Sequence, residues 1–212
     1  MPAKLQLYYI TDRTQMKSRS LEDCLACAIA AGVDWVQIRE KDLPTRTLLA
    51  LTQAAVEQAE QQGPGTRVIV NDRLDVALAA HAHGVHLGTR SMPVGVVRRL
   101  APPGFQVGAS CHSLEEAVAA QAAGADYLLL GPIFATPAKL QYGPPLGSTK
   151  LAEVTRQVTI PVFALGGITP AHVATCLASG AVGIAGIRIF QECDSMQDLV
   201  RELHAQALER QS

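Results

Sequence analysis

The stretch Ala31-Gly32-Val33-Asp34-Trp35-Val36-Gln37-Ile38-Arg39-Glu40 decides the fold, because it ends a helical pattern and begins an apolar strand pattern within ten residues. Gly32 suits the left-handed position that commonly follows a helix, and β-branched and aromatic residues follow it at once. The same turn returns at Ala123-Gly124-Ala125-Asp126, before the apolar run Tyr127–Leu130. The chain therefore repeats a helix-to-strand unit.

Outward from these two turns, short apolar runs alternate with longer Ala- and Leu-rich runs along the chain. We predict eight strands, at Leu5–Thr11, Trp35–Glu40, Arg67–Asn71, Val85–Leu87, Gln106–Ser110, Tyr127–Leu130, Pro161–Leu165 and Val182–Gly186. We predict helices at Ser20–Ala31, Thr45–Gln62, Asp75–Ala82, Val94–Leu100, Leu114–Ala123, Lys150–Arg156, Pro170–Ala178 and Ser195–Arg210.

Strands joined by helical crossovers run parallel, and eight such units are the number that closes a barrel. The sequence therefore predicts an α/β protein, a (β/α)8 TIM barrel that forms a single domain over residues 1–212. A doubly wound open sheet is the alternative, although no G-x-G-x-x-G motif follows the first strand.

Composition narrows the class of function. The net charge of −1 provides no basic field for nucleic-acid binding. No run approaches the roughly 18 apolar residues of a membrane span, and no secretory leader pattern opens the chain. We therefore expect a cytoplasmic protein whose partner is a small molecule, with no nucleic acid and no membrane.

In a barrel of this kind the active site lies at the carboxyl ends of the strands. Gln37, Arg39 and Lys41 alternate along one strand, so we expect them on one face, where two cations suit a phosphate or pyrophosphate. Ion pairs of these cations with Glu40 and Asp42 remain the alternative. Further polar residues at strand ends are Asn71, Asp72, Ser110 and Thr136.

Glycine turns end the last two predicted strands. Gly166 and Gly167 precede Thr169 and Pro170, an N-cap and a first-turn residue, so exposed N–H groups and the helix dipole could hold a phosphate there. Gly186-Ile187-Arg188 places a second set of backbone donors nearby. A tight turn without a ligand is the plainer alternative.

A long Pro- and Gly-rich loop, residues 131–147, follows the sixth predicted strand. Loops of this length in compact domains are commonly functional or disordered, so we predict that this loop is a lid that carries Lys139 over an anionic ligand. A passive linker is the alternative.

His112 follows the fifth predicted strand. Ser113 and Glu116 form an S-x-x-E capping box that would begin the next helix, which places the imidazole at the end of the strand. A histidine titrates near neutral pH and can accept and return a proton. The alternative is a histidine that only hydrogen-bonds a loop.

Taken together, these segments resemble the thiamine-phosphate synthase/TenI superfamily over almost the whole chain. The matching segments are Tyr9–Asp12, Gln37–Lys41, Val70–Leu78, Gly84–Gly88, Ser110–His112, Gly131–Phe134, Gly166–Ile168 and Gly183–Phe190. The resemblance implies one of two activities on this barrel.

In the synthases, a hydroxymethylpyrimidine pyrophosphate is joined to a thiazole phosphate with Mg²⁺ on the pyrophosphate. The resemblance implies that Arg39, Lys41, Asn71 and Lys139 meet the pyrophosphate and that Asp72 binds the metal. It also implies that the backbone at Gly167, Ile187 and Arg188 holds the thiazole phosphate. Synthases of this family commonly function as dimers, so the resemblance also suggests a homodimer.

TenI-type tautomerases aromatise a carboxylated thiazole phosphate, with a histidine at the position of His112 as general acid/base. Ser91 stands where the synthase pattern has a second metal-binding Asp, and Ala138 stands where that pattern has a hydroxyl. These departures favour a metal-independent thiazole phosphate tautomerase without a cofactor. An Mg²⁺-dependent synthase is the first alternative, and another phosphate-binding barrel or a non-catalytic regulator that binds thiamine intermediates stays open.

Overall fold

Eight parallel strands close into a barrel in which each strand pairs with its sequence neighbours and β1 pairs with β8. The computed structural model describes residues 5–16, 19–62, 65–136 and 144–208. The strands are β1 Gln6–Ile10, β2 Trp35–Ile38, β3 Arg67–Asn71, β4 Gly84–Leu87, β5 Gln106–Cys111, β6 Tyr127–Leu130, β7 Val162–Leu165 and β8 Gly183–Gly186. The predicted (β/α)8 barrel is confirmed, and the open sheet is excluded.

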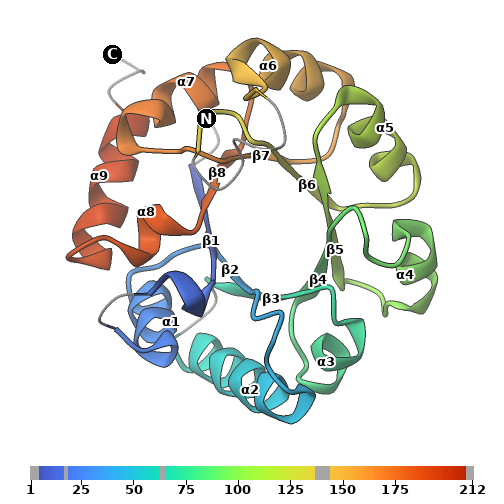
Figure 1. The fold of residues 1–212 in the computed structure, drawn as a ribbon, viewed down its shortest axis with the longest axis vertical. Helices are drawn as coiled ribbons and strands as arrows, with labels where there is room; N and C mark the ends of the chain where they lie inside the picture. Colours follow the sequence, from blue (N-terminus) through green and yellow to red (C-terminus); the bar gives the residue numbers. More distant parts are fainter. Residues whose placement is uncertain (1–4, 17–18, 63–64, 137–143, 209–212) are drawn as a thin grey trace.

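Helices surround the strands, as Figure 1 shows. The α-helices are α1 Leu21–Ala30, α2 Thr45–Gln61, α3 Leu74–Ala79, α4 Val94–Leu100, α5 Leu114–Ala122, α6 Gly147–Gln157, α7 Val173–Ala178, α8 Arg188–Gln191 and α9 Met196–Leu208. Short 3-10 helices lie at η1 Arg13–Gln15 and η3 Pro170–His172. None of the helices in the described ranges is both long and apolar enough to span a bilayer.

The repeated turn works as its glycines predict. Gly32 and Gly124 follow α1 and α5 with φ values of 79° and 95°, a backbone conformation that glycine adopts without strain. That one domain extends from residue 1 to residue 212 stays a prediction, because both chain ends lie outside the described residues.

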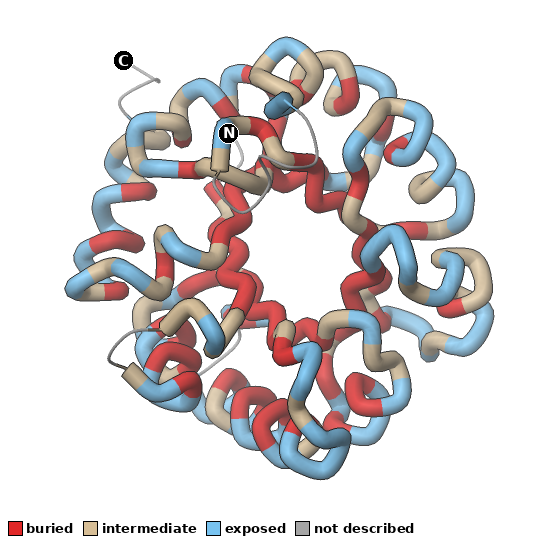
Figure 2. The backbone as a smooth tube through the Cα atoms, viewed as in Figure 1, coloured by how far each residue is buried: buried red, intermediate tan, exposed pale blue. Residues whose placement is uncertain are grey.

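Two apolar clusters make the core, one on each side of the strands. Inside the barrel, the rings of Tyr8, Trp35, Tyr127 and Phe163 pack against one another. The larger cluster lies between the strands and the helices. Figure 2 shows the strands as a buried ring within partly exposed helices. Because successive strand residues point to opposite faces, the interior cluster fixes which side chains point inward at each strand end.

Strand β2 ends at Ile38, two residues before the predicted end at Glu40. Beyond Ile38, hydrogen bonds to side chains replace the backbone hydrogen bonds between β1 and β2. The Arg39 N–H donates to Thr11 Oγ1 at 2.9 Å, and the Thr11 hydroxyl donates to the buried Glu40 carboxylate at 2.6 Å. The chain therefore leaves the sheet at Arg39.

Candidate active site at the barrel mouth

The carboxyl ends of the strands form one end of the barrel, which we call the mouth. At the ends of β1 and β2, Arg39 Nη1 lies 3.5 Å from Asp12 Oδ2, and both side chains are partly exposed, at 28% and 17%. Their positions continue the inward alternation of Tyr8, Ile10 and Trp35 in the interior cluster. A cation therefore lies at the mouth with a carboxylate to orient it.

Asp12 is itself held in place by its neighbours. It accepts hydrogen bonds from Thr14 Oγ1 at 2.6 Å and Gln15 Nε2 at 2.6 Å. Burial raises the pKa of the Asp12 carboxyl, but the bonds from Thr14 and Gln15 and the charge of Arg39 together outweigh burial and lower that pKa. The carboxylate is therefore ionised at neutral pH.

The end of β3 carries Asn71 and Asp72. Asp72 has a φ of 65°, a left-handed backbone that Asp tolerates better than most residues. Its N–H donates to the His86 carbonyl at 2.8 Å, and its side chain is exposed. The turn thus presents a carboxylate at the edge of the mouth.

Strands β4 and β5 contribute a pair made of the predicted Ser110 and of His86, which the sequence interpretation missed. The His86 side chain points into the barrel and is 2% exposed, and its Nε2 lies 2.8 Å from Ser110 Oγ. Burial and, second, the nearby Arg39 lower the pKa of His86 to about 3, so the ring is neutral. Strand alternation predicts that His86 faces away from Val85 and Leu87, and the structure shows that these two face the helices.

His112 follows β5 and is exposed, and its Nδ1 lies 2.5 Å from the Gly131 carbonyl oxygen after β6. The predicted cap is confirmed, since the Glu116 N–H donates to Ser113 Oγ at 3.1 Å. The Glu116 carboxylate accepts from the His112 N–H at 2.7 Å, one residue before the cap. The imidazole thus ties the ends of β5 and β6 together.

The Gly166-Gly167 turn after β7 packs closely against the segment that follows β6. The Phe134 N–H donates to the Gly166 carbonyl at 3.0 Å. A Cβ on Gly167 would lie 2.5 Å from the Ala135 carbonyl oxygen, and the φ of Gly167 is 64°. The glycines therefore have a packing role, whatever ligand their N–H groups meet.

The helix after this turn is shorter than predicted. Thr169 is the N-cap and Pro170 opens the helix, as predicted, but the first turn is the 3-10 helix η3, and α7 spans Val173–Ala178. Such short elements carry little macrodipole, so the helix dipole expected to help hold a phosphate contributes little at this turn.

The turn after β8 leads into α8, a short helix that the sequence interpretation missed. Arg188 is its first residue, and Arg188 Nη2 donates to Thr136 Oγ1 at 3.1 Å. This bond links the segment after β6 to the segment after β8. The predicted residues Thr136, Gly167, Ile187 and Arg188 therefore lie in one half of the mouth.

Comparison with known proteins places this barrel in a family. The family model described as thiamine monophosphate synthase (TMP-TENI) matches residues 7–190. This chain belongs to the thiamine monophosphate synthase family. A putative thiamine-phosphate synthase of Geobacter sulfurreducens is 49% identical over 179 residues, which cover 84% of this chain and 83% of that protein.

Two other family members agree. A thiamine-phosphate synthase of Methanoculleus marisnigri is 48% identical over 181 residues, which cover 85% of each chain. The solved structure of a thiamine phosphate pyrophosphorylase from Pyrococcus furiosus is 34% identical and superposes with a TM-score of 0.86, over 100% of this chain and 99% of that one.

The expectation of a thiazole tautomerase is wrong, because relatives that are 41–49% identical carry the synthase name. The physical argument gave too much weight to Ser91. Mg²⁺ in phosphate-transfer sites is commonly held by one or two carboxylates together with substrate phosphates, so one lost carboxylate does not exclude pyrophosphate chemistry. The proton shuttle assigned to His112 is withdrawn with that activity.

Two further cations, Lys41 and Lys139, were predicted for the family's pyrophosphate site. Lys41 is exposed in the turn after β2, because the strand ends before the alternation reaches it. Lys139, with residues 137–143 of the predicted lid, lies outside the described residues. For Arg39 the alternative of a pair with Glu40 or Asp42 is wrong: Arg39 pairs with Asp12. Glu40 and Asp42 pair with Arg13, whose Nη1 lies 3.2 Å from Glu40 Oε2 and 2.5 Å from Asp42 Oδ1.

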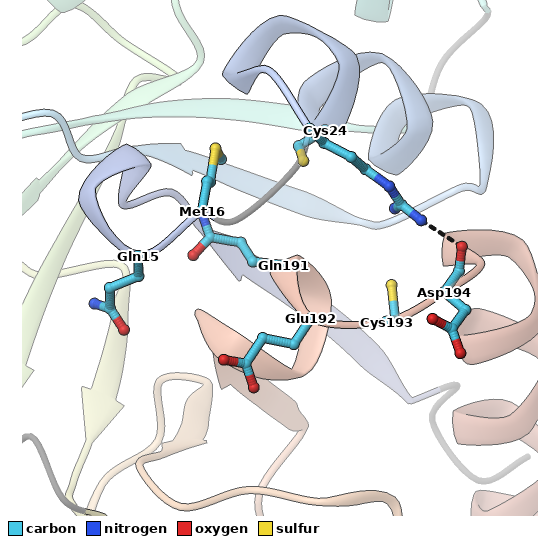
Figure 3. A pocket seen from close by; sticks show the side chains of 8 residues that line it. Gln15, Met16, Cys24, Gln191, Glu192, Cys193 and Asp194 are labelled. Atoms are coloured by element: carbon cyan, nitrogen blue, oxygen red, sulfur yellow. Dashed lines mark hydrogen bonds between the residues drawn. The ribbon is translucent and has the colours of Figure 1, made fainter.

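A separate cavity of about 140 Å³ lies between α1 and the segment that follows α8. Its lining residues are Gln15, Met16, Arg19, Cys24, Gln191, Glu192, Cys193 and Asp194. Figure 3 shows that Cys24 reaches it from one side and Cys193 from the other. Gln15 and Gln191 both hydrogen-bond Asp12, so the cavity walls support the mouth without forming it.

Proposed function

We propose that this chain is a thiamine-phosphate synthase, which joins hydroxymethylpyrimidine pyrophosphate to a thiazole phosphate. The observation that carries the proposal is that the two sides of one barrel mouth differ in the groups that they offer to an anion. Charged and polar side chains lie at the ends of β1, β2, β3 and β5, and glycine turns end β7 and β8. Two phosphorylated substrates require two such places, and the names of the relatives agree with this chemistry.

The part of the mouth formed by the ends of β1 to β5, which we call the side-chain half, suits the pyrophosphate. A guanidinium donates two parallel hydrogen bonds to phosphate oxygens, and Asp12 holds the Arg39 guanidinium at the end of β2. Asn71 and Ser110 lie on the neighbouring inward positions of β3 and β5 and would add neutral donors. Lys41 and Lys139 are assigned to the same pyrophosphate from the family resemblance.

The part formed by the ends of β6 to β8, which we call the glycine half, suits the thiazole phosphate. Backbone N–H groups at Gly167, Ile187 and Arg188 would donate to the phosphate oxygens, because glycine turns let a phosphate approach the main chain closely. The bond between Arg188 and Thr136 steadies both sides of this half.

The residues present fit Mg²⁺ bound jointly with substrate. The described residues contain no group of three or more His, Cys, Asp or Glu side chains placed to hold a metal ion. Ser91 Oγ accepts from the Gly88 N–H at 2.8 Å and so belongs to its own turn. The exposed Asp72 carboxylate would hold the ion, with pyrophosphate and water oxygens as its other ligands. When bound, Mg²⁺ would neutralise part of the charge on the pyrophosphate.

In the proposed reaction, the thiazole nitrogen supplies the electron pair for a new bond to the methylene carbon of the pyrimidine. The bond between that carbon and the pyrophosphate oxygen breaks, and its electrons leave with pyrophosphate. Negative charge therefore grows on the leaving group, where Arg39 stabilises it more in the transition state than in the bound substrate. The aromatic layer under the mouth keeps water from the methylene carbon.

The test is an assay of purified protein with both substrates and Mg²⁺, with thiamine phosphate and pyrophosphate measured separately. We expect the two products in equal amounts. The absence of thiamine phosphate, with both substrates shown to bind by calorimetry, would refute the proposed reaction. From the family resemblance we further propose a cytoplasmic homodimer, which light scattering and fractionation would test.

A further inference from the structure

The reaction proposed above leaves one buried polar side chain at the mouth unexplained. His86 lies on β4 with its ring 5.7 Å from that of Tyr127 and 6.5 Å from that of Tyr8, so it rests on the aromatic layer inside the barrel. Its Nδ1 is buried and has no hydrogen-bond partner among the described residues, whereas its Nε2 contacts Ser110 Oγ at 2.8 Å. An unpaired buried polar atom is costly enough to need a reason.

The unpaired atom decides which nitrogen carries the proton. Burial keeps the ring neutral, so one nitrogen is a donor and the other is an acceptor. A proton on Nδ1 would leave a buried N–H without an acceptor, and such orphaned donors are rarer than unused acceptors. The proton therefore belongs on Nε2, from which it is donated to Ser110 Oγ.

This assignment sets the direction of the Ser110 hydroxyl. Because Ser110 Oγ accepts from His86, its own hydrogen is free to point elsewhere. Ser110 is half-buried on an inward position of β5, so the open direction is the mouth.

We propose that His86 is a positioning residue that fixes the Ser110 hydroxyl as a hydrogen-bond donor to an acceptor atom of the pyrimidine pyrophosphate. The inference rests on the proposed function. It predicts that the Ser110 hydroxyl, held by His86, prefers a hydrogen-bond acceptor on the ligand over a hydrogen-bond donor. A freely rotating serine hydroxyl would show no such preference. His86 itself does not touch the reacting atoms.

Two amides of nearly the same chemistry test the assignment. In His86→Gln the side-chain NH₂ can reach the place of Nε2, whereas in His86→Asn it reaches only the place of Nδ1. We expect His86→Asn to lower kcat/KM for the pyrimidine substrate about 10-fold, the effect of one hydrogen bond, and His86→Gln to stay within about 3-fold of wild type. The KM for the thiazole phosphate should not change in either variant.

A double-mutant cycle with Ser110→Ala separates positioning from general damage. If His86 acts through Ser110, His86→Asn combined with Ser110→Ala should be no worse than Ser110→Ala alone. Losses that multiply, or a His86→Gln variant as impaired as His86→Asn, would overturn the positioning role. Thermal unfolding of each variant identifies losses that come from poor folding.

Failure of the reaction and failure of the inference give different results. The same double-mutant cycle can be measured on binding, by calorimetry of each variant with the pyrimidine pyrophosphate alone. If wild type binds this ligand without turnover and the cycle is non-additive, the proposed reaction fails and the positioning role stands. If wild type turns over and the cycle is additive, only the positioning role fails. Absence of binding would overturn both.

Discussion

Charged and polar side chains lie at the ends of β1, β2, β3 and β5, whereas β6 and β7 are followed by glycines packed against neighbouring backbone and β8 ends at Gly186, which packs against the Ile189 side chain. In the first half, Arg39 and Asp12 meet at 3.5 Å with part of each side chain exposed, so either can be replaced without disturbing the sheet. In the second half, a Cβ at Gly166 would lie 2.7 Å from Pro132. Substitutions should therefore affect chemistry in the first half and folding in the second.

Removal of Mg²⁺ should have the largest effect and should separate the halves most sharply. With EDTA we expect turnover to fall by more than about 100-fold, since a bound metal contributes several kcal/mol to charge stabilisation. Binding of the thiazole phosphate should stay within about 2-fold, because its proposed site consists of backbone donors. Calorimetry with and without EDTA measures this.

Restored turnover on adding Mg²⁺ is the control. Asp72→Asn should raise the Mg²⁺ concentration needed for half-maximal turnover. Loss of thiazole phosphate binding in EDTA would mean that one metal serves both halves, and the contrast between them would fail.

The second prediction tests the glycine half. Gly167→Ala adds a Cβ at 2.5 Å from a backbone oxygen, at a φ of 64°, so nothing flexible can yield. We expect the free energy of unfolding to fall by about 3 kcal/mol from strain and overpacking together. Urea denaturation measures the change.

Gly32→Ala is the matched control, because its φ is 79° but an added Cβ meets no atom of the described residues within 4 Å. It should cost only the backbone strain, about 1 kcal/mol. Equal losses in the two variants would show that the close packing of the Gly166-Gly167 turn contributes nothing.

The strand and helix pattern could be predicted from the sequence, because buried parallel strands and Ala-rich helices differ in period. The bounds of β3, β6 and α4 match the prediction, and the other strand ends differ by two residues at most. The short helix α8 could not be predicted, since four residues are too few to show a helical period. The early end of β2 depends on the Thr11 side chain, a contact between segments that periodicity does not encode.

The site residues were also predictable only in part, because alternation along a strand can be seen in the sequence and contacts between segments cannot. Arg39 was predicted as an inward residue of β2, and it lies at the mouth beside Asp12. His86 was missed because both faces of a barrel strand are buried, so its alternation with Val85 and Leu87 does not tell which face is the interior. The activity was predicted wrongly because Ser91 was taken as decisive, although its loss removes one ligand from a site that substrate oxygens can complete.

Arg39→Ala, a substitution in the side-chain half, should have the third-largest effect. We expect kcat/KM for the pyrimidine pyrophosphate to fall about 30- to 100-fold, because a charged donor to the leaving group is lost. Stability should change by less than about 1 kcal/mol, since the pair with Asp12 is partly exposed. Steady-state kinetics and urea denaturation measure both changes.

Arg39→Lys should recover only part of the loss, because an ammonium lacks the paired donors of guanidinium. Arg201→Ala is the control, since Arg201 forms an exposed pair with Asp198 on α9 and should leave kcat/KM unchanged. A fall in stability of several kcal/mol in Arg39→Ala, without a kinetic effect, would reverse the proposed contrast between the halves.

The smallest effect should come from Asp12, and it concerns pH. Its pKa is lower in the folded state than the usual 3.8, so its contribution to stability is present above about pH 4 and is lost as the pH falls through the folded value. Asp12→Asn cannot lose that contribution on acidification. The melting temperature of wild type should therefore fall more steeply below pH 4 than that of the variant, and the two curves should run parallel from pH 6 to 8. Parallel curves throughout would mean that Arg39, Thr14 and Gln15 hold the protonated side chain as well as the carboxylate, and Asp12 would then not be the charge that orients Arg39.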